Sequence, residues 1–296
     1  MQSGFVEFDL CERGKGRHIK SVHISERIVQ KCLCDQVLVS LLSRPIIHDN
    51  GASIKGKGLQ FAIKRLITHL SRFYREHQSN NGYALIVDFK GFFDNIDYAV
   101  LFQLLDSQIH DSRVRELTRR FIAVFGDGKS LGLGSQVSQI AAVFYPNHLD
   151  HYIKEILRIK YYGRYMDDLY LIHRDRSYLE WIKEVCTRLK ITINEKKTKI
   201  VQLNKGMLFL KGKYSLLENG KVLRLPCKMS ALRMRRKLRK FKVLLNEGRM
   251  SFEDMRTAYQ SWRGTFLKRF EAYHTVGRVD RLYSELFYRK RYLWFI

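Results

Sequence analysis

Residues 161–172 read YYGRYMDDLYLI, in which two adjacent aspartates stand between apolar, aromatic-rich arms. Each arm has the length of a short strand, so the stretch predicts a β-hairpin with Asp167 and Asp168 at or beside its turn. Neighbouring strand residues face opposite sides, and a hairpin tip can therefore bring both carboxylates near one cation. An isolated Asp-Asp pair is more often a solvated turn, but these arms are too apolar for an ordinary surface turn.

A second acidic strand end lies upstream. Residues 84–87 form an apolar run of strand length that ends at Asp88. Mg²⁺ takes oxygen ligands and is usually shared between one or two carboxylates and substrate phosphates. One aspartate at a strand end and two on a hairpin tip can jointly hold two such ions, an arrangement that serves nucleotidyl transfer by clamping the attacking and leaving oxygens.

The composition indicates a polyanionic partner. The 296 residues include 54 Lys and Arg against 29 Asp and Glu, a net charge of +25. Such an excess of positive charge favours nucleic acid over a membrane surface as the binding partner. The sequence has no run of 18 apolar residues and no signal-peptide pattern, and its five scattered cysteines lack zinc-site spacing. We expect a soluble, cytoplasmic protein with reduced thiols and no membrane partner.

The acidic motifs resemble those of a known family. The stretch Tyr165–Asp168 is similar to the catalytic signature of reverse transcriptases, and residues 88–96, DFKGFFDNI, resemble the palm motif that precedes it. Their order and separation (167 − 88 = 79 residues) agree with the family. The resemblance runs from about Phe5 to the C-terminal part.

This resemblance implies an α+β right-hand polymerase. We expect fingers at residues 1–80, a palm of antiparallel sheet and helices at 81–215 with an interleaved fingers segment, and a helical thumb and tail at 216–296. The chain starts almost at the fingers motif, so we expect the N-terminal segment common in relatives to be short or missing.

The resemblance also implies the catalytic residues. Asp88, Asp167 and Asp168 would be catalytic and, with the backbone carbonyl of Phe89, would hold two Mg²⁺ ions, for which Mn²⁺ could substitute. Lys197, in the motif at residues 191–200, matches the residue that protonates the leaving pyrophosphate. A basic loop edge without a catalytic role is the alternative for Lys197.

Other matched positions would bind the nucleotide. Arg17 matches the fingers arginine that binds the triphosphate, and Lys15 is a weaker candidate beside it; without the resemblance, this basic turn would be a solvated hairpin. Phe89 would border the nucleotide through its backbone. Phe93 lies five residues after Asp88 (93 − 88 = 5), where the family carries the aromatic gate that rejects a ribose 2′-OH, and packing is its alternative role.

The Gly-rich loop at residues 126–139 resembles the motif that supports the template base and incoming nucleotide, with Gly134 and Gln139 at its matched positions. Its form is most similar to that of diversity-generating retroelement enzymes, and phage-defence and unclassified bacterial enzymes share it. Leu133 stands where most members have glutamine, which predicts low fidelity. Pro146 departs from the family and should kink or restart the helix that follows this loop.

The C-terminal part completes the resemblance. Leu210, Lys211 and Gly212 match the primer-grip turn. Residues 221–249 hold eleven Lys and Arg and a single acid. An apolar stripe of Met234, Leu238, Phe241 and Leu245 at helical spacing, with Ser230 as the expected cap, predicts a thumb helix whose basic face lies along a primer–template duplex.

Together these features predict an RNA-directed DNA polymerase of a bacterial or phage retroelement, error-prone as in diversity-generating retroelements. Its partners would be an RNA template, a DNA primer and product, deoxynucleotides, and a small accessory protein or non-coding RNA. A defence-associated reverse transcriptase with unconventional priming or template is the first alternative. A non-catalytic nucleic-acid-binding scaffold is the second, and the presence of all three aspartates argues against it.

Overall fold

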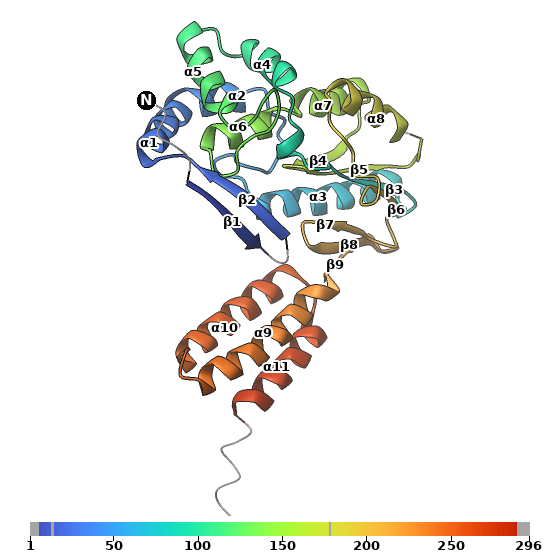
Figure 1. The fold of residues 1–296 in the computed structure, drawn as a ribbon. Coiled ribbons are helices and arrows are strands. Elements are labelled where there is room, and N and C mark those ends of the chain that lie inside the picture. Colours follow the sequence, from blue (N-terminus) through green and yellow to red (C-terminus); the bar gives the residue numbers. More distant parts are fainter. Residues whose placement is uncertain (1–5, 13–14, 178, 289–296) are drawn as a thin grey trace, which may run out of the picture. The chain divides into compact units, whose positions relative to one another are not determined.

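The structure, a computed structural model, describes residues 6–12, 15–177 and 179–288, and Figure 1 labels its helices and strands. The chain divides into two compact units. The first comprises the chain up to His77 together with Asn81–Gln202, and the second comprises Gln78–Asn80 together with the chain from Leu203 onward. Within the described residues, the helices are too short or too polar to cross a membrane.

The first unit is built around a four-stranded antiparallel sheet with the strand order β4-β5-β3-β6. Its strands are β3 (Tyr83–Asp88), β4 (Tyr161–Tyr165), β5 (Asp168–His173) and β6 (Lys199–Gln202). The central strands β3 and β5 are almost continuously apolar, a pattern consistent with burial on both faces. The predicted hairpin is confirmed, because β4 and β5 pair directly and place Tyr165 opposite Asp168.

Helices cover both faces of this sheet (Figure 1). Leu169 and Leu171 of β5 face the main core of the unit. The helices that contribute to this core include α4 (Tyr98–Asp106), α5 (Ser112–Ala123), α6 (Gln136–Phe144), α7 (Asn147–His151) and α8 (Leu179–Arg188). Tyr170 lies between the two leucines and faces the opposite side, where it contacts His69 of α3 (Leu59–His77).

The N-terminal part of this unit is a hairpin followed by a helix with an internal irregularity. The hairpin pairs β1 (Val6–Glu12) with β2 (Lys15–Ser21). Helix α1 (Ile24–Leu33) continues through a π-helical turn, Cys34–Leu38, into α2 (Val39–Ser43). Helix α1, the π-helical turn and α2 contact α6, most of which is buried.

Pro146 has the predicted effect on the chain after α6. Helix α6 ends at Phe144, and Pro146 precedes the first residue of α7. A proline lacks the amide hydrogen needed inside a helix, so it is tolerated where a new helix begins. A second π-helical turn, Tyr152–Ile156, continues from α7.

The second unit contains a three-stranded antiparallel meander and three helices. The meander is formed by β7 (Met207–Phe209), β8 (Gly212–Leu216) and β9 (Val222–Pro226). The helices are α9 (Lys228–Asn246), α10 (Phe252–Arg269) and α11 (Tyr273–Phe287). Their shared core contains the predicted stripe residues Met234, Leu238 and Phe241, and Leu245 packs against it.

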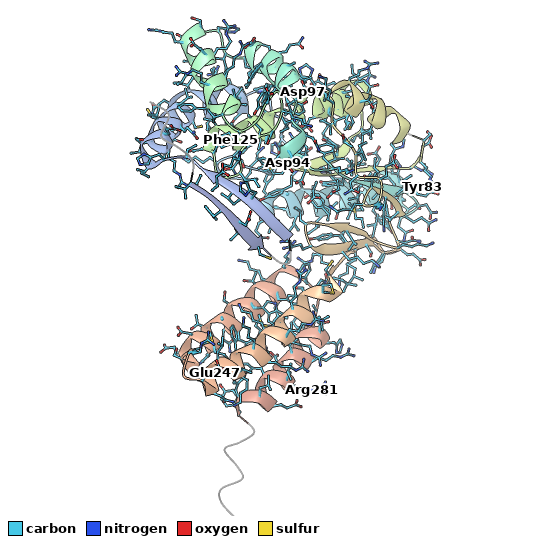
Figure 2. All side chains as sticks on the ribbon, viewed as in Figure 1. Tyr83, Asp94, Asp97, Phe125, Glu247 and Arg281 are labelled. Atoms are coloured by element: carbon cyan, nitrogen blue, oxygen red, sulfur yellow. The ribbon has the colours of Figure 1, made fainter. Side chains whose placement is uncertain are left out.

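The predicted cap of α9 is wrong. The helix begins at Lys228, directly after Cys227, and the carbonyl of Cys227 accepts the backbone N–H of Ser230 at 2.9 Å. The chain therefore turns into the helix immediately after Pro226, and Ser230 already lies in the first turn. Figure 2 shows Glu247 at the C-terminal end of α9 and Arg281 in α11.

Candidate active site

Two of the predicted aspartates meet at one end of the central sheet. In the antiparallel register of β3 and β5, Asp88 lies directly opposite Asp168. Residues in such a pair project from the same face of a sheet, with Cβ atoms about 5 Å apart. The two strands therefore deliver both carboxylates to one place, as the sequence predicted.

The third aspartate lies in the turn between β4 and β5. Met166 takes a left-handed backbone conformation, with φ of 56°, and Asp167 follows it. The carbonyl of Asp167 accepts the backbone N–H of Phe89 at 3.3 Å. The hairpin tip is thus tied to the end of β3, which holds Asp167 next to the strand that carries Asp88.

A buried arginine braces this turn, and sequence reasoning missed it. Arg164 of β4 is fully buried and forms an ion pair with Asp150 of α7, whose side chain is also fully buried. Its guanidinium donates to both carboxylate oxygens of Asp150, to the carbonyl of Met166 at 3.2 Å and to that of Val143 at 2.9 Å. The hydroxyl of Tyr162 also donates to Asp150.

This network is electrostatically self-consistent. Burial acts to lower the pKa of Arg164, but the negative charge and hydrogen bonds of Asp150 outweigh it and raise that pKa. Burial also raises the pKa of the Tyr162 hydroxyl, with a further contribution from Asp150. Arg164 therefore stays charged and links the Asp-Asp hairpin to α6 and α7. The signal in the sequence was an arginine inside an otherwise apolar strand.

Lys197 lies at Asp88. Its Nζ contacts the two carboxylate oxygens of Asp88 at 2.7 and 2.8 Å. Asn194, which sequence reasoning also missed, donates its side-chain amide to the same carboxylate at 3.0 Å and its backbone N–H to the Asp88 carbonyl at 2.8 Å. The backbone contact fixes the segment that follows Ile191 beside the end of β3, and so brings Lys197 within reach.

The donor set suits a hard cation shared with a substrate. Within the part of the chain that the structure describes, His, Cys, Asp and Glu form no group of three or more that could hold a metal ion by itself. Mg²⁺ commonly takes only one or two protein carboxylates and completes its shell with substrate phosphates and water. The facing pair of Asp88 and Asp168 fits that pattern, with Asp167 and the backbone of Phe89 alongside.

Phe93 lies in a tight turn after Asp88. Gly91, with φ of 52°, lets the chain reverse into a 3₁₀ turn, Phe93–Asn95. The ring of Phe93 is half-buried and packs edge-on against Phe92, with 5.9 Å between centroids. Figure 2 labels Asp94 in this turn. The partial exposure of Phe93 agrees with either predicted role, gate or packing.

The Gly-rich loop lies beside the N-terminal hairpin. Gly134 is exposed with φ of 106°, and a Cβ placed on it would lie 3.9 Å from Ile19 of β2. Ser135 caps α6 and donates its hydroxyl to the buried Gln30 of α1 at 3.0 Å. Gln139 is exposed, and its amide donates to Ser53 at 2.9 Å.

The predicted phosphate-binding residues lie on that hairpin. The backbones of Lys15 and Arg17 belong to β2, the strand that also carries Ile19. Their side chains lie outside the part that the structure describes.

The predicted primer-grip residues form a hairpin turn within the second unit. Leu210 and Lys211 connect β7 to β8 and have φ values of 46° and 66°. Arg269 donates to the carbonyl of Leu210. A side chain at Gly212 would collide with the ring of Tyr214, so the turn requires glycine there.

The architecture is that of an α+β right-hand polymerase. The family described as "Reverse transcriptase (RNA-dependent DNA polymerase)" matches residues 13–266, and the chain belongs to this family. Its members are nucleotidyltransferases. No curated protein matches the chain.

Solved telomerase structures share the fold. Apo telomerase from Candida tropicalis is 14% identical with a TM-score of 0.56, over 97% of this chain and 62% of that one. The same enzyme in complex with a TWJ fragment of telomeric RNA is 13% identical with a TM-score of 0.58, over 98% and 59%. The Candida albicans complex with a TWJ fragment is 11% identical with a TM-score of 0.58, over 95% and 58%. The chain thus spans about three-fifths of the length of these telomerase chains.

Proposed function

We propose that the protein is an RNA-directed DNA polymerase that extends a DNA primer with deoxynucleotides on an RNA template. The observation that carries the proposal is the register of β3 and β5, which sets Asp88 opposite Asp168 with Lys197 at the same carboxylate. Family membership supports the reaction class. The net charge of +25 supports a nucleic-acid partner.

In the proposed reaction the primer 3′-hydroxyl loses its proton to solvent water and its oxygen bonds to the α-phosphorus of the deoxynucleotide. The α–β phosphoanhydride bond breaks, and pyrophosphate leaves. Two Mg²⁺ ions, replaceable by Mn²⁺, would lower the pKa of the 3′-hydroxyl and neutralise the phosphate charges when bound. Asp88, Asp167, Asp168 and the Phe89 carbonyl would hold them.

Lys197 would give the proton that the leaving pyrophosphate takes up. Its side chain is 54% exposed, so it can leave Asp88 and turn toward a bound nucleotide.

The nucleotide would lie between the aspartates and the N-terminal hairpin. Arg17, with Lys15 beside it, would bind the triphosphate, because a guanidinium donates bidentately to phosphate. Gly134 and Gln139 would border the base. The half-buried ring of Phe93 would meet the sugar and exclude a ribose 2′-OH. The placement of Gly134 beside β2 supports this arrangement.

We assign fingers, palm and thumb to residues 1–80, 81–215 and 216–296. In the second unit, the turn of Leu210, Lys211 and Gly212 would hold the primer end, and the basic helix α9 would contact duplex phosphates.

A primer-extension assay on an RNA template tests the activity. We expect Asp167→Asn to lower the rate by about 10³-fold, because metal-ion stabilisation of the transition state is worth several kcal/mol. Asp175→Asn is the matched control, since Asp175 lies exposed beyond the far end of β5 and uses its carboxylate to cap a turn. Extension by Asp167→Asn at the wild-type rate would reject the three-aspartate site.

We further propose that the enzyme serves a bacterial or phage retroelement, works in the cytoplasm with a small accessory protein or non-coding RNA, and copies with low fidelity. The low-fidelity proposal rests on Leu133, which is half-buried directly before the exposed Gly134. A leucine cannot hydrogen-bond the nucleotide or template base, so selection there depends on shape, which discriminates by only about 1–3 kcal/mol.

Fidelity can be tested by one substitution. Leu133→Gln should lower the misincorporation frequency on a defined RNA template by up to about tenfold, if the glutamine adds about 1.4 kcal/mol of discrimination. The measurement is sequencing of the extension products. Leu133→Met is the control for side-chain volume without a hydrogen-bonding group. Identical error spectra for wild type and Leu133→Gln would separate Leu133 from fidelity.

A further inference from the structure

A basic pocket of about 640 Å³ lies beside α3, away from the aspartate end of the sheet. Five cationic side chains line it: Arg65, Arg72, Arg75, Lys154 and Lys160. Two carboxylates, Asp49 and Glu76, also reach it, so the lining carries a net charge of +3 with His69 neutral (5 − 2 = 3). This volume is within the range of ligand-binding sites in proteins.

The carboxylates hold several of these cations in fixed positions. Asp49, 8% exposed, accepts from Arg65 Nε at 2.5 Å and from Lys154 Nζ at 2.8 Å. Burial acts to raise the pKa of Asp49, but the hydrogen bonds and charges of Lys154 and Arg65 lower it overall, so it stays ionised. Glu76 accepts from Lys160 Nζ at 2.8 Å and from the Tyr161 hydroxyl at 2.5 Å. Arg65, Lys154 and Lys160 are therefore held in place before any ligand arrives.

His69 forms a neutral part of the lining. Burial lowers its pKa to about 4. Arg65 Nη2 lies 3.1 Å from Nε2 of His69, and a guanidinium can only donate, so Nε2 is the acceptor and Nδ1 carries the hydrogen. Nδ1 then donates to the hydroxyl of Tyr170 at 3.0 Å. Arg65 is thus held from two sides, by Asp49 and by His69.

The rim of the pocket follows α3. Arg65 and Arg72 are seven residues apart, two helical turns, and so lie on the same side of the helix, about 10 Å from each other. Arg72 is exposed. This spacing exceeds the size of one phosphate group, so the two guanidinium groups can meet successive phosphates.

The lining favours phosphate over a nucleobase. Among the described residues that line the pocket, the aromatic ones are His69 and Tyr161. Tyr161 is 8% exposed, and its hydroxyl donates a hydrogen bond to Glu76. It therefore offers no free ring face on which a base could stack. Sites for free nucleotides usually have apolar walls, whereas this lining is mostly charged. Charged contacts to phosphates bind a strand without reading its sequence.

We propose that this pocket binds the phosphate backbone of a single nucleic-acid strand. In β5, Ile172, which pairs with Tyr161, lies four residues beyond Asp168, a distance of about 13 Å along the strand. A strand engaged at the aspartates could therefore reach the pocket within a few nucleotides. This deepens the proposed polymerase function by adding a second anchoring point for its nucleic acid.

The test measures the salt dependence of RNA binding in two charge-matched variants. Arg72→Gln/Arg75→Gln alters the pocket, and Arg113→Gln/Arg120→Gln removes the same charge from exposed positions of α5. Fluorescence anisotropy follows a short labelled single-stranded RNA over a range of KCl concentrations, without deoxynucleotides. Each lost phosphate contact lowers the slope of log K against log salt by about 0.7, so the pocket variant should lose about 1.4.

Three outcomes overturn the proposal. The first is an equal slope of log K against log salt in the pocket and α5 variants, and the second is a change of this slope with RNA but not with a DNA strand of the same sequence. The third is loss of ATP or inorganic triphosphate binding in the pocket variant while its RNA slope is unchanged. The last result would assign the pocket to a free nucleotide. If the double variant does not fold, Arg72→Gln alone should lower the slope by about 0.7. Because no step of the assay requires catalysis, inactivity in primer extension rejects the proposed function without affecting this result.

Discussion

The sheet of the first unit carries two ion pairs of opposite character. Arg164 and Asp150 are 0% exposed, and Arg164 also donates to two backbone carbonyls. The pair of Lys197 and Asp88 is 54% and 16% exposed, at the open end of the strands. A buried pair is costly to break, whereas an exposed one contributes little to stability and can exchange partners. The comparison assigns the first pair to the scaffold and leaves the second able to take part in chemistry.

Removal of the buried arginine is the strongest way to test this comparison. Arg164→Met should reduce the free energy of unfolding by about 3–5 kcal/mol, because it leaves the charge of Asp150 buried without a cationic partner. For a unit of this size that corresponds to a decrease in Tm of about 10 °C. Thermal and urea unfolding measure both quantities.

Two further variants make this result interpretable. Arg113→Met, at a side chain 91% exposed, should change stability by less than about 0.5 kcal/mol. Adding Asp150→Leu to Arg164→Met should recover part of the loss, since a buried pair can be replaced by apolar groups. If Arg164→Met lowers the free energy of unfolding by less than about 1 kcal/mol, the buried pair contributes no more to stability than an exposed one.

Arg164 also shows where sequence reasoning reached its limit. The Asp-Asp hairpin and the strand ending at Asp88 could be predicted, because local apolar patterns specify them. Lys197 was singled out only by the resemblance of its motif to that of the family. The partner of Arg164 could not be predicted, since Asp150 is on a helix before the hairpin and only the tertiary fold brings them together. A buried arginine within an apolar strand signals a partner without identifying it.

Asn194 and the basic pocket were missed for a related reason. Asn194 reaches Asp88 through strand-end pairing between segments more than a hundred residues apart (194 − 88 = 106). The pocket combines α3 with the chain around residues 49 and 154–161. The wrong cap at Ser230 has a local cause instead, because α9 begins directly after Cys227, which takes the cap position without a side-chain hydrogen bond.

His69 provides a buried polar group of a third kind, a neutral side chain that is hydrogen-bonded to Arg65 and Tyr170. Its pKa falls from 6.5 to about 4 on folding because of burial, so the unfolded chain binds the extra proton between these values. Protonation of His69 in the unfolded chain therefore does not affect the free energy of unfolding above pH 6.5, and it lowers that free energy as the pH falls toward 4. The linked change is about 3 kcal/mol at 1.36 kcal/mol per pH unit.

The measurement is urea unfolding at pH 7 and near pH 4. His69→Gln, which cannot titrate, should lose about 3 kcal/mol less than wild type between the two conditions. His110→Gln, at an exposed position, controls for loss of one imidazole and should follow wild type. The same pH dependence in His69→Gln and wild type would show that His69 is not held neutral by the fold.

The exposed pair gives the smallest expected effect and the sharpest contrast with Arg164. Lys197→Met should leave stability within about 1 kcal/mol of wild type, as for other solvent-exposed pairs. If Lys197 is the general acid, the same variant should lower kcat about 10²-fold, equivalent to about 2.7 kcal/mol, with little change in KM. Lys197→Arg distinguishes a role as proton donor from a role as a positive charge, because a guanidinium keeps the contact with Asp88 but releases a proton far less readily. We expect normal stability and a reduced kcat in Lys197→Arg; full activity there would assign Lys197 to a basic loop edge whose charge alone matters.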